Sequence, residues 1–463
     1  MHDRDICCRG FLTIVRNDRR NNTIDNYSLN LDMRQPKKLS TFTIQLSTAI
    51  LLLTLTILPV FTRAASILIP MDDEQKDCLK SYGIAFWVLK NGEEVDWLLN
   101  YRGGSFMTKY DKKIEDECNI RGVSYEVLAD AKVNEIVTEV SDPSVNMDIV
   151  KLEKAPRMAV YSPKDKLPWD DAVTLVLKYA EIPYDVVYDE EVIKGDLPKY
   201  DWLHLHHEDF TGQYSKFYGG FRYAQWYNDD VRNQEALAHK LGFQKVSQMK
   251  LAVAEKIRDF CAGGGFLFAM CSGTDTFDIA LAAHNTDICE SMFDGDAADP
   301  EAQSKLDFSQ TFAFQNFTLD MNPLSHQFSN IDVSANRQID QAHDFFTLFD
   351  FSAKWDVVPS MLTQNHDRVI KGFMGLTTAF NESKLKPGVI IMGEMKTANE
   401  ARYIHGEYGK GQWTFYGGHD PEDYQHMVGD PPTDLKLHPN SPGYRLILNN
   451  VLFPAAHKKK QKT

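Results

Sequence analysis

A cysteine in a turn of small residues is the feature of this sequence that most directly suggests chemistry. An apolar strand that follows three glycines ends in the turn Ala269-Met270-Cys271-Ser272-Gly273. This is the form of a nucleophile elbow, because a sharp strand-to-helix turn tolerates only small neighbours and points the next backbone N–H at a developing oxyanion. Alanine stands first, where the motif usually has glycine, and it is still small. We therefore interpret Cys271 as a candidate nucleophile. Ser272 and Gly273 complete the elbow and are the candidates for stabilising the oxyanion.

A histidine that can serve as the base follows a later apolar strand. The sequence from 409 to 416 has the composition of a strand, and the residues at 417–423 read GGHDPED. A cysteine nucleophile needs a base to take its proton, and an acidic group often orients that base. We expect His419 to be the base for Cys271 and Glu422 to orient the imidazole. The alternatives for the orienting acid are Asp420 and Asp423.

Both residues also have purely structural explanations. Free cysteine is among the most buried residue types, so Cys271 can be a buried structural thiol, and His419 can be a packed or capping histidine. The combination of an elbow with a histidine at a matching strand end favours catalysis. Iodoacetamide distinguishes the two interpretations, because a thiolate with a depressed pKa reacts faster than a buried thiol.

From residue 157 onward, short apolar strands alternate with helical segments. The helix at 169–179 opens with two aspartates, which suit the positive end of the helix dipole. This alternation predicts an α/β fold with a parallel sheet and helices on both faces. Ligands of such sheets bind at the carboxyl ends of the strands. The predicted strands are 157–161, 184–188 and 201–205 and the elbow strand, and a helix at 248–260 precedes the elbow strand.

The elbow and the ending at 409–422 together resemble the class I glutamine amidotransferase-like superfamily, and more closely its ThuA-like branch, which is associated with sugar utilisation. The resemblance runs from residue 157 to the C-terminus and implies a flavodoxin-like doubly wound parallel sheet with insertions. It also implies a Cys-His-acid site. This chain has H-D-P-E where the superfamily usually has H-P-E, and it carries an elbow cysteine that many ThuA-like members lack.

The resemblance implies a cysteine-dependent hydrolase or amidotransferase-like enzyme that acts on an amide or ester of a small-molecule or glycan-type substrate, without a cofactor. Similar exported proteins have been labelled asparagine synthetase B. The chain has no S-G-G-x-D-S loop for ATP, which argues against a synthetase. Two alternatives stay open: a non-catalytic, carbohydrate-associated binding protein, and a metal-dependent hydrolase that uses a histidine cluster at 204–207.

That histidine cluster lies at the end of a predicted strand, where residues 203–209 read LHLHHED. Three histidines and two carboxylates are suitable ligands for a metal ion. However, His204 and His206 alternate with apolar residues and share one face of the strand, which also fits buried, hydrogen-bonded histidines. We assign no metal, and we treat His206, His207 and Glu208 as a candidate substrate or metal loop.

An aromatic insertion follows at 214–227, which reads YSKFYGGFRYAQWY. Aromatic faces suit sugar rings, and glycine-flanked loops can act as lids. Tyr218 and Trp226 are therefore candidates for substrate contacts. The alternative is that these rings pack the insertion onto the domain.

The N-terminal region predicts export. A positively charged segment begins at Met33, an apolar segment spans 44–61, and Ala64-Ala65 resembles a cleavage site, so we predict a signal peptide at 33–64. Residues 1–32 are then an over-extended start. The alternative is an uncleaved membrane anchor, because the apolar run nearly spans a bilayer. Either way, the protein is expected in the periplasm or outside the cell, with this segment as its only membrane contact.

Five cysteines follow the predicted signal peptide. In an oxidising compartment, the pairs Cys78–Cys118 and Cys261–Cys289 would leave Cys271 free, as a nucleophile requires. The alternative is five separate reduced thiols.

Composition indicates a folded two-domain protein that does not bind nucleic acid. The chain has 463 residues and a net charge of −15, which repels phosphate backbones. An Asn91-Gly92 turn between apolar runs at 84–90 and 95–101 predicts a β-hairpin in the first domain. The oligomeric state stays open. The predicted units are a small α/β N-terminal domain at 65–154, an amidotransferase-like domain at 155–456 and a basic tail at 457–463.

Overall fold

The structure is a computed structural model that describes residues 64–163, 171–425, 427 and 430–456. The described residues belong to one compact unit. The predicted over-extended start, the signal peptide up to residue 63 and the basic tail lie outside them. Strand β1 (Ala64–Ile69) begins at the predicted cleavage site, so a chain that starts at Ala65 keeps nearly all of this strand.

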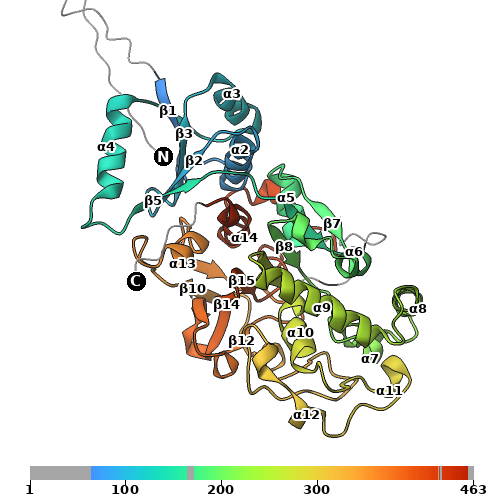
Figure 1. Ribbon diagram of the computed structural model, residues 1–463. Coiled ribbons are helices and arrows are strands. Elements are labelled where there is room, and N and C mark those ends of the chain that lie inside the picture. Colours follow the sequence, from blue (N-terminus) through green and yellow to red (C-terminus); the bar gives the residue numbers. More distant parts are fainter. Residues whose placement is uncertain (1–63, 164–170, 426, 428–429, 457–463) are drawn as a thin grey trace, which may run out of the picture. The chain divides into compact units, whose positions relative to one another are not determined.

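The first sheet is antiparallel and has the strand order β4-β1-β3-β2-β5. Helix α2 (Cys78–Lys90) packs on one face through Tyr82, which lies against Trp97 and Phe106. Helix α4 covers the other face (Figure 1). The remaining elements are β2 (Val95–Leu99), β3 (Ser105–Lys109), α3 (Lys112–Arg121), β4 (Glu126–Ala129), α4 (Asp130–Ser141) and β5 (Asp148–Leu152).

The predicted hairpin at Asn91-Gly92 is wrong in its first half, because this turn joins helix α2 to strand β2. Residues 84–90 are almost entirely buried, and periodicity cannot assign a buried apolar run of this length to helix or strand. The start of the helix is set by Asp77, whose side chain accepts the Lys80 backbone N–H.

The second sheet has ten strands, and one half of it is parallel. The parallel strands lie in the order β7-β6-β8-β9-β15, so the last of them pairs with the elbow strand β9. The protein is therefore mixed α/β. These strands are β6 (Met158–Tyr161), β7 (Asp185–Val187), β8 (Trp202–Leu205), β9 (Phe266–Met270) and β15 (Gly411–Tyr416).

The other half of this sheet is antiparallel, which corrects the expectation of a wholly parallel sheet. Antiparallel neighbours need no crossover helix. The long insertion between residues 283 and 400 therefore adds strands without the alternation that reveals βαβ units. These strands are β10 (Phe345–Leu348), β11 (Val369–Lys371), β12 (Phe380–Asn381), β13 (Ile390–Met395) and β14 (Glu400–Tyr408).

Helices cover both faces of the parallel half, as predicted. Met158 and Val160 share a core cluster with α5 (Ala172–Tyr179) and α14 (Pro442–Leu452), whereas Ala159 and Tyr161 share another with α9 and α10. This division follows from the alternation of side chains along a strand. The other helices are α6 (Asp189–Lys194), α7 (Tyr218–Phe221), α8 (Gln225–Lys240), α9 (Val246–Ala262), α10 (Ser272–Ala282), α11 (Ser291–Asp294), α12 (Ala302–Lys305) and α13 (Val357–Leu362).

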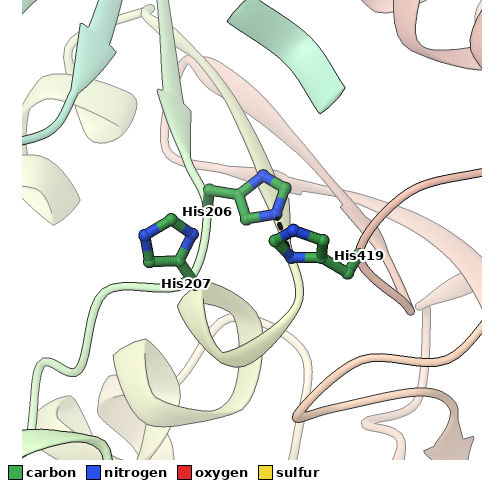
Figure 2. A group of neighbouring side chains, drawn as sticks. All are labelled: His206, His207 and His419. Atoms are coloured by element: carbon green, nitrogen blue, oxygen red, sulfur yellow. Dashed lines mark hydrogen bonds between the residues drawn. The ribbon is translucent and has the colours of Figure 1, made fainter. Parts of the chain in front are cut away.

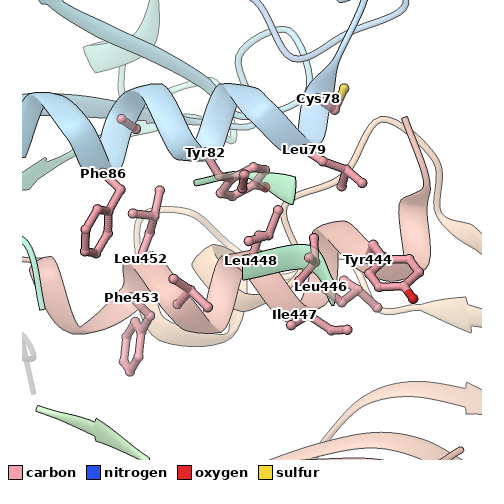
Figure 3. Packing of buried hydrophobic residues seen from close by; sticks show 14 of the residues in the cluster. Cys78, Leu79, Tyr82, Phe86, Tyr444, Leu446, Ile447, Leu448, Leu452 and Phe453 are labelled. Carbon is pink, nitrogen blue, oxygen red and sulfur yellow. The ribbon is translucent and has the colours of Figure 1, made fainter. Parts of the chain in front are cut away.

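Helix α14 joins the two sheets. Its buried residues Leu448 and Leu452 face Tyr82 and Phe86 of helix α2 (Figure 3). The Tyr82 hydroxyl donates to Asn449 Oδ1 at 2.5 Å, which adds a buried polar contact between the two helices. Because one apolar core continues from α2 into the second sheet, the two sheets are packed as parts of one unit.

A buried histidine in β14 is expected to make the stability of the fold depend on pH. His405 is 2% exposed, and burial lowers its pKa to about 4. In the unfolded chain histidine takes up a proton near pH 6.5, so stability from this residue is present above that pH and is lost as the pH falls toward about 4. We expect urea unfolding to lose about 2 kcal/mol through His405 between about pH 7.5 and about pH 5.

The variant His405→Gln should remove this part of the acid sensitivity. For each protein, the unfolding free energy is measured at both pH values and the change between them is calculated. Comparing this change between wild type and variant isolates His405, because the contributions of the other titrating groups are the same in both proteins. An equal pH dependence in both proteins would contradict the prediction.

Candidate active site

The predicted elbow forms where β9 ends and α10 begins. Cys271 lies between Met270 and Ser272 with φ 51° and ψ −141°. This left-handed backbone conformation favours glycine, and it costs another residue about 1–3 kcal/mol. Strained residues of this kind cluster at functional sites. The strained backbone conformation therefore singles out Cys271 as the functional candidate in this turn.

Gly273 fits the elbow tightly against the end of β8. Its backbone N–H donates to the carbonyl oxygen of His206 at 2.5 Å. A Cβ atom at this position would lie 2.2 Å from the same oxygen. Only glycine allows this approach, so the elbow and the histidine loop after β8 are held together by backbone contact.

The sulfur of Cys271 is buried among backbone N–H groups. The Leu376 N–H donates to Sγ at 3.2 Å, and the side chain is only 1% exposed. Burial raises the pKa of the Cys271 thiol to about 11, although the N–H groups of Thr377, Leu376 and Ser272 lower it. A thiol whose pKa is raised in this way needs a base to remove its proton during attack.

The segment 373–378 connects the cysteine with the histidine strand. Besides the Leu376 contact to Cys271, Met374 O accepts the His419 N–H at 2.8 Å and Thr377 O accepts the Gly418 N–H at 2.8 Å. Sequence analysis missed this segment, because it contributes backbone groups from an insertion and has no motif of its own.

His419 follows β15, which runs parallel to β9 with Tyr416 opposite Met270. Both candidate catalytic residues therefore lie at the carboxyl ends of neighbouring strands. The His419 Nδ1 atom lies 2.8 Å from Nε2 of His206 (Figure 2). The role of His419 as base requires a contact between its imidazole and the Cys271 sulfur, and this contact stays a prediction.

The acids expected to orient His419 have other described partners. Glu422 lies 3.1 Å from His438 Nδ1, and Asp420 accepts hydrogen bonds from the Glu422 N–H at 2.9 Å and the Thr433 hydroxyl at 2.7 Å. Asp423 forms an isolated bridge with Asp420. Within the described residues, His419 shares a side-chain hydrogen bond with another histidine, His206.

Asp171 continues the chain of contacts behind His206. Its Oδ1 lies 3.5 Å from His206 Nδ1, and its Oδ2 lies 3.4 Å from His204 Nε2. Asp171 caps helix α5 by accepting the N–H groups of Val173 and Thr174. Sequence analysis assigned it only to the helix dipole. Its link to His206 comes from a strand and a helix that are distant in sequence.

The charges of this group follow from burial and hydrogen bonding. Burial raises the pKa of Asp171, whereas the charged forms of His206 and His204 and the Thr174 N–H lower it, and the net shift is downward. Burial lowers the pKa of His206 well below its usual value. His206 Nδ1 lies 3.5 Å from Asp171 without forming a hydrogen bond. When His206 Nε2 is the acceptor in its hydrogen bond with His419, His419 carries its proton on Nδ1 and its lone pair on Nε2.

Neighbouring residues of the loop after β8 have different surroundings: His207 lies beside the other histidines, and Glu208 does not. The His207 ring lies 5.1 Å from the ring of His206 and 5.9 Å from that of His419, between centroids. Nitrogen atoms of these three histidines all lie within 4.8 Å of one another, so they could hold a metal ion. Glu208 contacts instead Tyr188 at 3.2 Å and Lys250 at 3.8 Å.

The aromatic insertion forms a small core of its own. Trp226 is 39% exposed and packs on Phe221 with ring centroids 5.1 Å apart, and Tyr218 lies 6.1 Å from Phe293. Tyr218, Phe221 and Phe293 belong to a cluster that also includes buried Tyr214 and Tyr227. These contacts favour the packing interpretation, and substrate contacts at Tyr218 and Trp226 stay a prediction.

The hypothesised disulfides are not formed. All five cysteines of the described chain are free and buried, at positions 78, 118, 261, 271 and 289. Sequence spacing suggested the pairs but carries no information on the distance between the thiols.

Within the described residues, no helix is both long and apolar enough to span a bilayer.

Comparisons with known proteins find only weak likeness. No family model and no curated protein matches the chain. A cytoplasmic protein from Salmonella typhimurium has 10% identity and a TM-score of 0.31 over 67% of this chain and 91% of its own. A second, from Salmonella typhimurium LT2, has 10% identity and a TM-score of 0.25 over 63% of this chain and 85% of its own. Likeness at this level carries no argument about function.

Proposed function

We propose that this protein is a cysteine-dependent hydrolase or amidotransferase-like enzyme that acts on an amide or ester. The observation that carries the proposal is the strained elbow, which holds Cys271 at φ 51° on the strand next to the one that ends at His419. A strained non-glycine residue at the carboxyl end of a parallel strand is the typical position of a nucleophile.

The chemistry proceeds through a thioester. His419 accepts the thiol proton, and the sulfur bonds to the substrate carbonyl carbon while the C=O electron pair moves onto oxygen. Backbone N–H groups near the sulfur, from Ser272 and the segment 373–378, are the donors for that oxyanion. Collapse expels an amine or alcohol, which takes the proton from His419. Water then attacks the thioester with His419 as base, releasing the acid and restoring the thiol.

His206 and Asp171 are positioning residues in this scheme. The scheme requires that His206 accepts the Nδ1–H of His419, which leaves the lone pair for proton transfer on His419 Nε2. The Asp171 carboxylate lies 3.5 Å from His206 Nδ1, behind this hydrogen bond. The role that an acid fills in a Cys-His-acid site is thus divided between a histidine and a distant carboxylate.

The finer fold and the location belong to the same proposal. Taken in chain order, the parallel strands lie second, first, third, fourth, fifth, which is the order of flavodoxin-like sheets and supports that assignment. The likeness to class I glutamine amidotransferases of the ThuA-like branch, and export by a signal peptide that begins at Met33, rest on sequence motifs. Burial of the thiol favours a small acyl group, on a small-molecule or glycan-type substrate.

The test uses p-nitrophenyl acetate as a generic activated ester. We expect wild-type protein to release nitrophenol and to gain the mass of one acetyl group on the peptide that contains Cys271, because hydrolysis passes through a thioester. Rapid acid quenching followed by mass spectrometry detects the adduct.

Cys261→Ala is the matched control, because Cys261 is also a buried thiol but its sulfur contacts Gln412 O at the opposite end of the sheet. This variant should acylate like wild type. Acetylation only at other residues, or unchanged hydrolysis by Cys271→Ala, would exclude the cysteine mechanism in favour of the carbohydrate-binding or metal-dependent alternative.

A further inference from the structure

Three imidazoles from two strand ends converge beside the elbow. His206 and His207 follow β8, His419 follows β15, and their ring nitrogens lie within 4.8 Å of one another (Figure 2). Three histidine nitrogens with a fourth position open are a common ligand set for Zn²⁺. Borderline-soft nitrogen ligands without carboxylates also favour late transition metals over Mg²⁺ or Ca²⁺.

We propose that His206, His207 and His419 bind one Zn²⁺ ion, and that the bound ion blocks acyl transfer by withdrawing His419 from Cys271. The metal site stands on the geometry of the three histidines. Its inhibitory effect rests on the proposed cysteine chemistry.

The spacing requires only a small movement. Two nitrogens bound to one tetrahedral zinc lie about 3.3 Å apart, because each Zn–N bond is about 2.0–2.1 Å long. His206 Nε2 and His419 Nδ1 are 2.8 Å apart, so the two rings must separate by about half an ångström. His207 is half-buried and belongs to a loop, so its ring can complete the site.

Asp171 prepares His206 for this role. Its carboxylate lies 3.5 Å from His206 Nδ1 on the side away from His419. A metal-binding histidine usually donates its second N–H to such a carboxylate, which fixes the tautomer and strengthens the ligand. His206 therefore already presents Nε2 toward the position of the metal.

The neighbouring side chains do not belong to the ligand set. His204 Nδ1 is hydrogen-bonded to Phe268 O at 3.2 Å, its Nε2 lies 3.4 Å from Asp171, and Glu208 lies 3.8 Å from Lys250. This set therefore differs from the cluster 204–207 suggested by sequence, because His419 replaces His204.

A second candidate metal site is excluded because a lysine already lies within it. Asp287, Cys289 and Asp294 also lie close enough to share a metal. However, the Lys245 ammonium lies 2.9 Å from Asp287 and 3.0 Å from Asp294, and so already supplies the positive charge there.

Zinc inhibits catalysis in this proposal because it occupies one nitrogen of the His419 ring, and the proton is then carried by the other. As base, His419 carries its proton on Nδ1 and its lone pair on Nε2. A metal bound at Nδ1 moves the proton to Nε2, which then cannot accept the thiol proton of Cys271. Zinc binding and catalysis by His419 are therefore mutually exclusive.

The experiment first measures binding without reference to activity. Chelator-treated full-length protein is titrated with Zn²⁺ in competition with a chromogenic chelator, and with Co²⁺, whose visible spectrum reports tetrahedral coordination. We expect one ion per chain, and at least about tenfold weaker binding by His207→Ala, which loses a ligand from a half-buried loop. Glu208→Gln and Cys271→Ala are the matched controls and should bind as wild type does. Equal zinc affinity in wild type and His207→Ala would overturn the site, as would failure of folded wild type to bind.

The second measurement is hydrolysis of p-nitrophenyl acetate at increasing Zn²⁺. We expect inhibition with the same midpoint as binding, and a shift to higher zinc in His207→Ala relative to its own metal-free rate. Full activity at saturating zinc would overturn the inhibitory role. Zinc-stimulated hydrolysis that persists in Cys271→Ala would make the metal catalytic and overturn it too. A protein without esterase activity would contradict the proposed function, and the titration would still decide the metal site.

Discussion

Replacing Cys271 or His419 with alanine is expected to reduce ester or amide hydrolysis by about a thousandfold or more, and the double variant should lose little beyond either single one. The reason is that the thiol and its base act as one unit, so that removal of either leaves the other without a function. The measurement is kcat/KM for the two single variants and the double variant. Additive losses would contradict a shared mechanism.

The control for this prediction is a thermal melt of each variant. Cys271 is buried, so alanine leaves a small cavity and should cost about 1 kcal/mol of stability even though the fold persists. Cys271→Ser nearly keeps the volume and removes the sulfur, which separates packing from chemistry. If Cys271→Ala is strongly destabilised and fully active, Cys271 is a structural thiol and the proposed mechanism is wrong.

Gly273→Ala is expected to destabilise the protein by about 3 kcal/mol or more, or to prevent soluble expression. The added Cβ would lie 2.2 Å from the His206 carbonyl oxygen, so the elbow and the end of β8 would have to separate. The hydrogen bond from Gly273 to that oxygen would break, which should also displace His206 from His419. Urea unfolding measures the first effect, and zinc affinity measures the second.

Gly220→Ala is the matched control, because it is also a helical glycine but a Cβ there meets no atom within 4 Å. Alanine in an open helical position should stabilise by up to about 1 kcal/mol. Unchanged stability of Gly273→Ala would show that the elbow does not depend on this contact.

Several parts of the fold could be predicted because their signals are local. The strands around 157–161, 184–188 and 201–205 are short apolar runs separated by helices, and the structure forms β6, β7 and β8 there. The prediction failed at residues 84–90, where burial on all sides removes the periodicity that separates a helix from a strand. It also failed for the antiparallel strands of the long insertion, whose pairing is not encoded in local alternation.

The candidate site likewise has features that the sequence predicts and features that only the tertiary structure shows. By itself, the sequence determined that Cys271 occupies a strand-to-helix turn and that His419 ends a later strand, because small residues and glycines set backbone turns over a few positions. The tertiary structure alone decided that His206 is hydrogen-bonded to His419 with Asp171 behind it, and that Glu422 lies against His438. It also decided that the thiol is buried, which raises its pKa. Both depend on which strands and loops meet at the carboxyl edge of the sheet, since hydrogen bonding and desolvation are set by neighbours in space and not along the chain.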